Sequence, residues 1–301
     1  MSGSTQLEKM AKVYDKEIMP TWSAKFGKLL MRNVTFPTEG MVLDVLCGTG
    51  YPAVDFMRSN PDSRARIIAI DNVGPLLDEA RKKAVDFFGK RLFFRNENPA
   101  KGLSFADEVY DLSYSNVGLM NYGKPWRNLI EFSRVTRSSG TVAVTLPLSG
   151  SWMEFFDIYR EILTKRDKYD LLKRLDDYEA AHYPTADTVI DWMNKAGLRN
   201  IQAETERFEL LFKTGREFFY SSVVEYGPLP DWKRVIENPA EVNEVFAEIN
   251  DAIDTHFRGL VFSVTIEAGC FTGQKLAWDQ VVEDEGVLEE DDIEIIEEVE
   301  D

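Results

Sequence analysis

Residues 42–50, with the sequence VLDVLCGTG, have the types and spacing of a ligand-binding segment. The first half is a short apolar strand that contains a carboxylate, Asp44, and the second half is a loop of small residues leading into a helix at Tyr51. Glycine lets a backbone approach a ligand closely, and the N–H groups at a helix start are free to donate hydrogen bonds. A buried strand has no structural need for an acid. The segment therefore predicts a site for a ligand that carries hydroxyls and a cationic group.

Strands and helices alternate around this segment. Apolar strands are expected at 42–46, 66–70, 91–95, 111–115 and 141–146, and helices at 5–33 (interrupted at Pro20), 51–59, 75–88 and 126–136. This alternation predicts an α/β, Rossmann-like, doubly wound and mostly parallel sheet. In such a sheet the ligand crevice lies at the carboxyl ends of the first two strands.

The pattern changes after residue 147. Helical segments are expected at 152–166, 186–196 and 215–250, with strands at 201–212 and 261–268. Two late strands with helical inserts predict an antiparallel closing strand pair, with inserts at about 150–195 and 213–258 forming a helical lid. The sequence thus predicts four parts: an N-terminal helical cap (1–39), a ligand-binding core (40–150), lid helices plus closing strands (151–282) and an acidic tail (283–301).

Charge and composition restrict the partners. The net charge is −17, and twelve of the acids lie in residues 283–301, which contain no Lys or Arg. The rest of the chain is mildly acidic without a basic stripe, which argues against a nucleic-acid partner. The tail is expected to be a solvated, disordered end, or alternatively a docking segment for a basic protein.

No stretch approaches 18 uninterrupted apolar residues, and the N-terminus lacks a signal-peptide layout. Cys47 and Cys270 fit no metal spacing and suggest no disulfide framework. We therefore expect a cytoplasmic protein with no membrane span and no metal.

Four segments together resemble the class I S-adenosylmethionine (SAM)-dependent methyltransferases. They are VLDVLCGTG, IIAIDNVGPLLDEAR, LSFADEVYDLSYSN and YDKEIMPTW, and the match covers residues 10–150. The resemblance is closest to the small-molecule group (methyltransferase type 11) that includes quinone-biosynthesis methyltransferases. It implies SAM as cofactor and in-line transfer of its methyl group to a small or carrier-bound, partly apolar acceptor.

The resemblance also implies which residues contact SAM. Asp44 and the glycine loop would hold the methionine part, Asp71 the ribose hydroxyls, and Leu76 the adenine. The contact to the adenine amino group falls at Glu97 or Asn98. The expected cofactor-binding residues are Tyr14, Asp44, Leu46, Cys47, Gly48, Thr49, Gly50, Asp71, Asn72, Leu76, Glu97, Asn98, Ser115 and Asn116.

One position departs from the family pattern. The family usually has glycine where this chain has Leu46, and a leucine there could weaken or reshape the site. The alternative function is therefore a non-catalytic module that binds SAM or its product and acts through protein partners, using the acidic tail. Residues 48–53 also satisfy a G-x-G-x-x-A dinucleotide pattern, but Asp44 inside the strand favours SAM over NAD.

The catalytic residues are less defined, because a sulfonium methyl group needs a general base only when the acceptor is protonated. Tyr122, Glu154 and His182 are candidates for polar groups at the acceptor site, and each also has a plain structural interpretation. Cys47 is more typical of a small packing residue than of a nucleophile, because no His lies nearby in sequence. The aromatic run at 152–159 either packs the lid or lines an apolar acceptor pocket.

Overall fold

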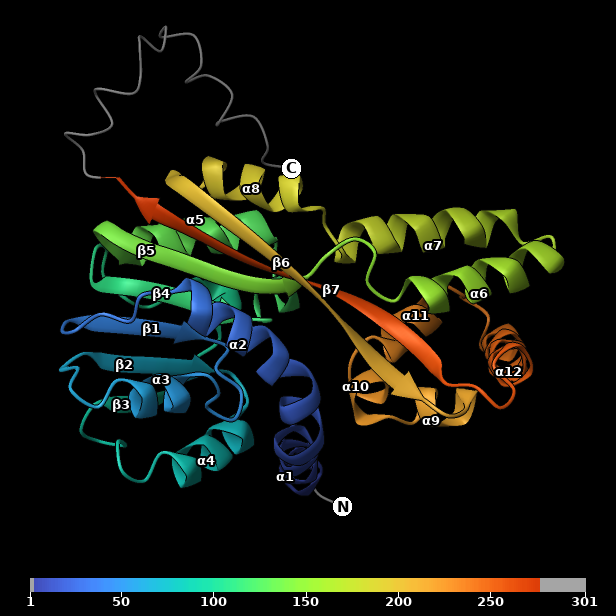
Figure 1. The fold of residues 1–301 in the computed structure, drawn as a ribbon, viewed down its shortest axis with the longest axis horizontal. Coiled ribbons are helices and arrows are strands. Elements are labelled where there is room, and N and C mark those ends of the chain that lie inside the picture. The colour runs from blue at the N-terminus through green and yellow to red at the C-terminus, as the bar shows by residue number, and fades with distance from the viewer. Residues whose placement is uncertain (1–2, 277–301) are drawn as a thin grey trace, which may run out of the picture.

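A computed structural model describes residues 3–276 of the 301-residue chain. The acidic tail at 283–301 lies outside the described residues. A seven-stranded sheet runs through the molecule, and helices cover both of its faces (Figure 1). None of the helices within residues 3–276 has the length and apolar character needed to cross a bilayer.

The sheet has the strand order β3-β2-β1-β4-β5-β7-β6. Strands β1 to β5 are parallel, and β7 is antiparallel to both β5 and β6. This confirms the predicted mostly parallel sheet with an antiparallel closing pair. The strands are β1 (Met41–Val45), β2 (Arg66–Asp71), β3 (Leu92–Asn96), β4 (Tyr110–Asn116), β5 (Thr136–Pro147), β6 (Leu198–Phe212) and β7 (Phe262–Lys275).

Two apolar cores lie on opposite faces of the sheet. One face is covered by α2 (Ala24–Asn33), α3 (Ala53–Ser59) and α4 (Gly74–Lys83). The other is covered by α5 (Pro125–Val135) and α8 (Ala186–Lys195). Helix α8, which the sequence assigns to the lid, packs instead against α5 and β6.

The N-terminal helical segment changes geometry where it passes the carboxyl ends of the strands. Helix α1 (Gly3–Val13) is followed by the π-helix η1 (Tyr14–Ser23), which contains Pro20, and then by α2. Wider helical turns of this kind occur frequently at functional sites. Here the π-helix directs Tyr14 toward the glycine loop.

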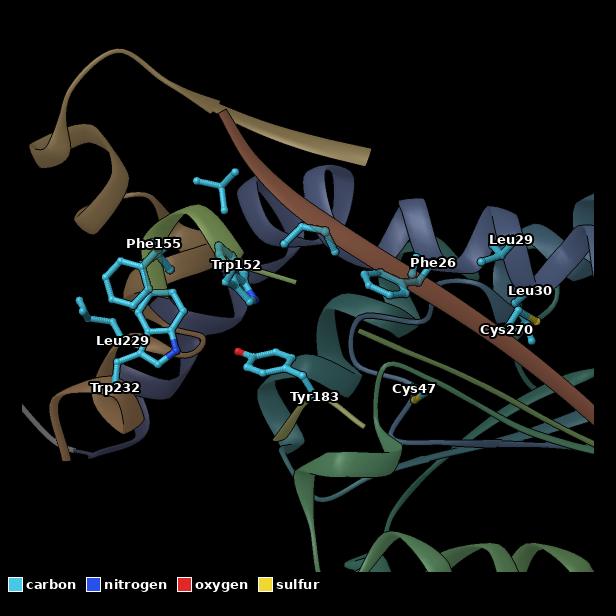
Figure 2. Close-up of a cluster of buried hydrophobic side chains, with 14 of the residues drawn as sticks. Phe26, Leu29, Leu30, Cys47, Trp152, Phe155, Tyr183, Leu229, Trp232 and Cys270 are labelled. Atoms are coloured by element: carbon cyan, nitrogen blue, oxygen red, sulfur yellow. The ribbon is translucent and has the colours of Figure 1, made fainter. Parts of the chain in front are cut away.

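The remaining helices surround the projecting ends of β6 and β7 (Figure 1). They are α6 (Met153–Lys165), α7 (Tyr169–His182), α9 (Gly215–Phe219), α10 (Ser222–Glu225), α11 (Leu229–Arg234) and α12 (Pro239–His256). We call this group the helical lobe. Its aromatic interior centres on Trp232, which stacks on Phe155 with ring centroids 4.1 Å apart. Figure 2 shows this cluster beside Tyr183, whose hydroxyl is directed toward Trp232.

Three predicted helices have different limits in the structure. The helix expected at 75–88 ends at Lys83, because the chain turns back through Phe87 to enter β3. The helix expected from Tyr51 starts at Ala53. The helical region expected at 215–250 is divided into four helices by turns, and two of these helices, α11 and α12, have a proline in the first turn, Pro230 and Pro239, where proline is well tolerated.

Candidate cofactor and acceptor sites

The glycine loop after β1 adopts left-handed backbone conformations, which residues with a side chain normally avoid. Leu46, Gly48 and Gly50 have φ angles of 60°, 54° and 86°. A Cβ atom built on Gly48 would lie 3.2 Å from the ring of Tyr14. The loop therefore forms a cradle that needs a small residue at Gly48, and the tyrosine of the π-helix covers it.

Asp71, the last residue of β2, joins this loop to the next one. Its carboxylate accepts hydrogen bonds from the N–H groups of Gly48 and Val73, both at 2.9 Å. Burial raises the pKa of Asp71, whereas these backbone hydrogen bonds lower it. Each carboxylate oxygen keeps a further acceptor position, so Asp71 can still bind ligand hydroxyls.

A cavity of about 190 Å³ lies at this edge of the sheet. Eight of the fourteen predicted cofactor residues line it: Tyr14, Leu46, Gly48, Asp71, Asn72, Leu76, Asn98 and Asn116. Six residues complete the lining: Val73, Pro99, Val117, Gly118, Asn121 and Tyr122. We call this the cofactor cavity.

Six predicted residues do not line the cofactor cavity: Asp44, Cys47, Thr49, Gly50, Glu97 and Ser115. Cys47 is buried in the apolar core, where burial raises the pKa of its thiol well above the ordinary value. The Ser115 hydroxyl donates to the carbonyl of Val45. Glu97 accepts from the N–H of Ser104, so Asn98 is the better placed of the two adenine candidates.

Thr49 has a structural contact in place of a cavity contact. Its hydroxyl accepts a hydrogen bond of 2.9 Å from Lys83 Nζ, and Lys83 also forms an ion pair with Asp15 of the π-helix. Lys83 thus connects three elements: the glycine loop, α4 and the N-terminal cap. This connection holds Tyr14 over the cofactor cavity.

Asp44 lies beneath the glycine loop. It is fully buried, and its Oδ2 accepts a 3.0 Å hydrogen bond from the hydroxyl of Tyr114. Its Oδ1 has no hydrogen-bond partner among the described residues. An unpaired buried carboxylate oxygen is costly unless a ligand completes it, and a cationic amino group is a suitable partner.

These observations fit SAM. The Gly48 cradle accommodates close approach, Asp71 can accept from ribose hydroxyls, and Leu76 offers an apolar surface for adenine. Asp44 does not reach the wall of the cofactor cavity, so it can act on the methionine ammonium only through its unpaired Oδ1 and a bridging water.

Replacing Asp44 with asparagine is expected to stabilise the protein at pH 8, because asparagine carries no charge for burial to penalise while Tyr114 can still donate to its carbonyl oxygen. Burial raises the pKa of Asp44 well above 3.8, and the Tyr114 hydrogen bond lowers it. The unfolded chain therefore ionises first, and wild-type stability falls as pH rises from about 4 toward the folded pKa. Asparagine removes this dependence.

Urea unfolding at pH 5 and pH 8 measures the effect, with the exposed Asp55→Asn variant as control. The gain from Asp44→Asn should be larger at pH 8 than at pH 5. Equal losses of stability at both pH values would show that Asp44 supports the fold in its charged form.

A second cavity, of about 520 Å³, adjoins the first. Tyr14, Val117 and Asn121 line both cavities, so these residues form a common wall. Five Trp and Tyr residues belong to the rest of the lining: Trp22, Trp152, Tyr178, Tyr183 and Tyr226. We call this the aromatic cavity.

The three catalytic candidates lie in different places. Tyr122 lines the cofactor cavity, and burial raises the pKa of its phenol well above 10, so it stays protonated. His182 lines the aromatic cavity, with its ring stacked on Tyr178. Glu154 lines neither cavity: its carboxylate accepts from the backbone N–H and the hydroxyl of Thr265, so its contacts are structural.

The sequence interpretation missed most of the common wall. Val117 and Asn121 lie in the segment that follows β4, and their position after a strand's carboxyl end was an available signal. The φ of 54° at Val117 was not predictable from its residue type.

No group of three or more His, Cys, Asp or Glu side chains within the described part of the chain is arranged to hold a metal ion.

Comparison with known proteins agrees with this geometry. Residues 43–144 match the family model described as a methyltransferase domain. The chain is 26% identical over 170 residues to the ubiquinone/menaquinone biosynthesis C-methyltransferase UbiE of Bdellovibrio bacteriovorus, covering 52% of this chain and 68% of that protein.

Two solved structures show the same fold. The YcgJ protein of Bacillus subtilis superposes with a TM-score of 0.55 at 16% identity, covering 84% of this chain and 99% of that one. Phosphoethanolamine N-methyltransferase 2 of Haemonchus contortus, solved with S-adenosyl-L-methionine, superposes with a TM-score of 0.51 at 12% identity. The match covers 85% of this chain and 53% of that one. With the family match and the cofactor cavity, residues 43–144 form a methyltransferase domain, and SAM is the cofactor of this domain.

Proposed function

We propose that the protein transfers the methyl group of SAM to a small or carrier-bound, partly apolar acceptor held in the aromatic cavity. The observation that carries the proposal is the common wall of Tyr14, Val117 and Asn121 between the cofactor cavity and the aromatic cavity. These three residues border both cavities, so the methyl group of a cofactor in one cavity would lie beside an acceptor in the other. The aromatic lining suits an acceptor with a flat or apolar body.

Bound SAM supplies a methyl group already activated by the sulfonium charge. The chain itself contributes orientation and exclusion of water, and orientation alone can supply roughly 7–11 kcal/mol of such a barrier. The buried rings of Trp152 and Tyr183 keep the inner part of the aromatic cavity apolar. The acceptor is thereby held against the wall that borders the methyl group.

A protonated acceptor would need a base, and His182 is the candidate. Its Nδ1 lies 2.8 Å from the carbonyl oxygen of Tyr178, which favours a proton on Nδ1. In the neutral ring Nε2 then remains as the acceptor nitrogen. The UbiE relative is named a C-methyltransferase, which supports a carbon nucleophile, and oxygen or nitrogen acceptors are compatible with the same cavity.

The test is a binding measurement followed by methyl transfer. Calorimetric titration should show one S-adenosylhomocysteine (SAH) per chain. SAM labelled in its methyl group should then label at least one member of a panel of naphthoquinols, catechols and aryl amines. Binding of SAH without transfer to any acceptor class would instead support the non-catalytic module. Absence of SAH binding would contradict the proposal from its first step.

A further inference from the structure

Leu46 lies at the centre of a packing arrangement that the cofactor chemistry does not explain. Its φ of 60° is costly for a leucine, by roughly 1–2 kcal/mol. Its side chain lines the cofactor cavity. It also packs against the apolar core on the face of the sheet that α5 covers, as the side chains of Met120 and Tyr122 do. A strained residue persists only where its surroundings hold it.

The partner of Leu46 is Gly118. A Cβ atom built on Gly118 would lie 2.9 Å from the Cβ of Leu46 and 2.5 Å from the hydroxyl oxygen of Ser115. Any side chain at position 118 would therefore collide with Leu46 or Ser115. The glycine gives Leu46 the space that its side chain fills.

Gly118 belongs to the segment 117–122, which we call the post-β4 loop. Two anchors hold its ends. The N–H of Val117 donates to the carbonyl of Thr145 at 3.0 Å, and Asn128 Nδ2 donates to the carbonyls of Leu119 and Tyr122 at 3.1 and 2.7 Å. Between these anchors, the side chains of Leu46 and Ser115 pack against the backbone at Gly118.

The same loop supplies Val117 and Asn121, two of the three residues in the wall common to both cavities. Val117 also has a left-handed backbone, with φ 54°, so this part of the wall is held in a costly conformation. We propose that Leu46 is a positioning residue: through Gly118 it holds the post-β4 loop in the conformation that forms the wall between cofactor and acceptor.

In Leu46→Gly we expect the protein to stay folded while hydrogen exchange in the post-β4 loop becomes faster. Glycine accepts φ 60° without strain, so the fold should persist. The post-β4 loop loses its support, so backbone amides at 117–122 should exchange hydrogen on the order of tenfold faster. Leu46→Met, which refills the space, should restore slow exchange.

Hydrogen exchange of the full chain with SAH bound, beside calorimetry, is the measurement. A matched control is Leu172→Gly in α7, also a partly buried leucine but packed in the helical lobe. Unchanged exchange at 117–122 in Leu46→Gly would overturn the inference. So would SAH binding more than tenfold tighter without faster exchange, which would make Leu46 a simple obstruction of the cofactor cavity.

The consequence for turnover rests on the proposed function. With an acceptor in hand, Leu46→Gly should lower kcat, because the wall beside the acceptor is altered. The exchange measurement needs no acceptor. A failure of the proposed function, seen as no methyl transfer by the wild type, is therefore distinguishable from a failure of the Leu46 inference.

Discussion

Replacing Asp71 with alanine is expected to weaken SAH binding by at least roughly 100-fold, or about 2.7 kcal/mol. The carboxylate accepts hydrogen bonds from Gly48 and Val73, and such bonds to a charged group contribute about 1.5–3 kcal/mol each. Alanine removes both, so the glycine loop loses its fixed position. It also removes the acceptor that we propose for the ribose hydroxyls. Isothermal calorimetry on the full chain measures the change.

The control is Asp78→Ala, an exposed carboxylate in α4 whose ion pair with Arg81 lies on the helix surface. It should bind SAH as the wild type does. Circular dichroism establishes that both variants are folded. Wild-type affinity in a folded Asp71→Ala variant would mean that the ligand does not use the β2 end, and that the cofactor cavity is wrongly assigned.

Filling the aromatic cavity is expected to stop methyl transfer while leaving cofactor binding intact. Val223 of α10 lines the aromatic cavity but not the cofactor cavity. Val223→Trp should lower turnover of any acceptor at least roughly 100-fold, since displacement from a near-attack position removes most of the orientation benefit. SAH affinity should change less than about threefold. Labelled methyl transfer and calorimetry on the same preparation measure the two quantities.

Overpacking at Val223 costs about 1–3 kcal/mol, so thermal unfolding must accompany the assay. Val85→Trp, at a side chain that is 71% exposed, is the matched control and should keep full activity. Normal turnover in a folded Val223→Trp variant would place the acceptor elsewhere. Loss of SAH binding would mean that the two cavities do not act as separate sites.

The sheet and the cofactor-loop residues could be predicted from sequence because they depend on local signals. The alternation of apolar strands with helices predicted parallel strands. Gly48 and Asp71 follow or end neighbouring parallel strands, so they lie close together in the structure. The antiparallel pair of β6 and β7 followed from two late strands separated by helical material. These features depend on residues within one βαβ unit or one strand pair.

The aromatic cavity could not be predicted in this way. Its walls come from Tyr14, Val117, Tyr183 and Val223, which are brought together only by the complete fold. Glu154 shows the same limit, since its partner Thr265 lies 111 residues away along the chain. The departure at Leu46 was visible in sequence, but its accommodation by Gly118 depends on the contact between two loops.

The central claim is that the cofactor and acceptor cavities meet at the wall of Val117 and Asn121. A crystal structure of the complex with SAH tests it most directly. We predict the nucleoside beside Asp71 and Leu76, with the sulfur atom facing Val117 and Asn121 and the aromatic cavity open to it. SAH bound within the aromatic cavity, or with its sulfur directed away from that wall, would contradict the account.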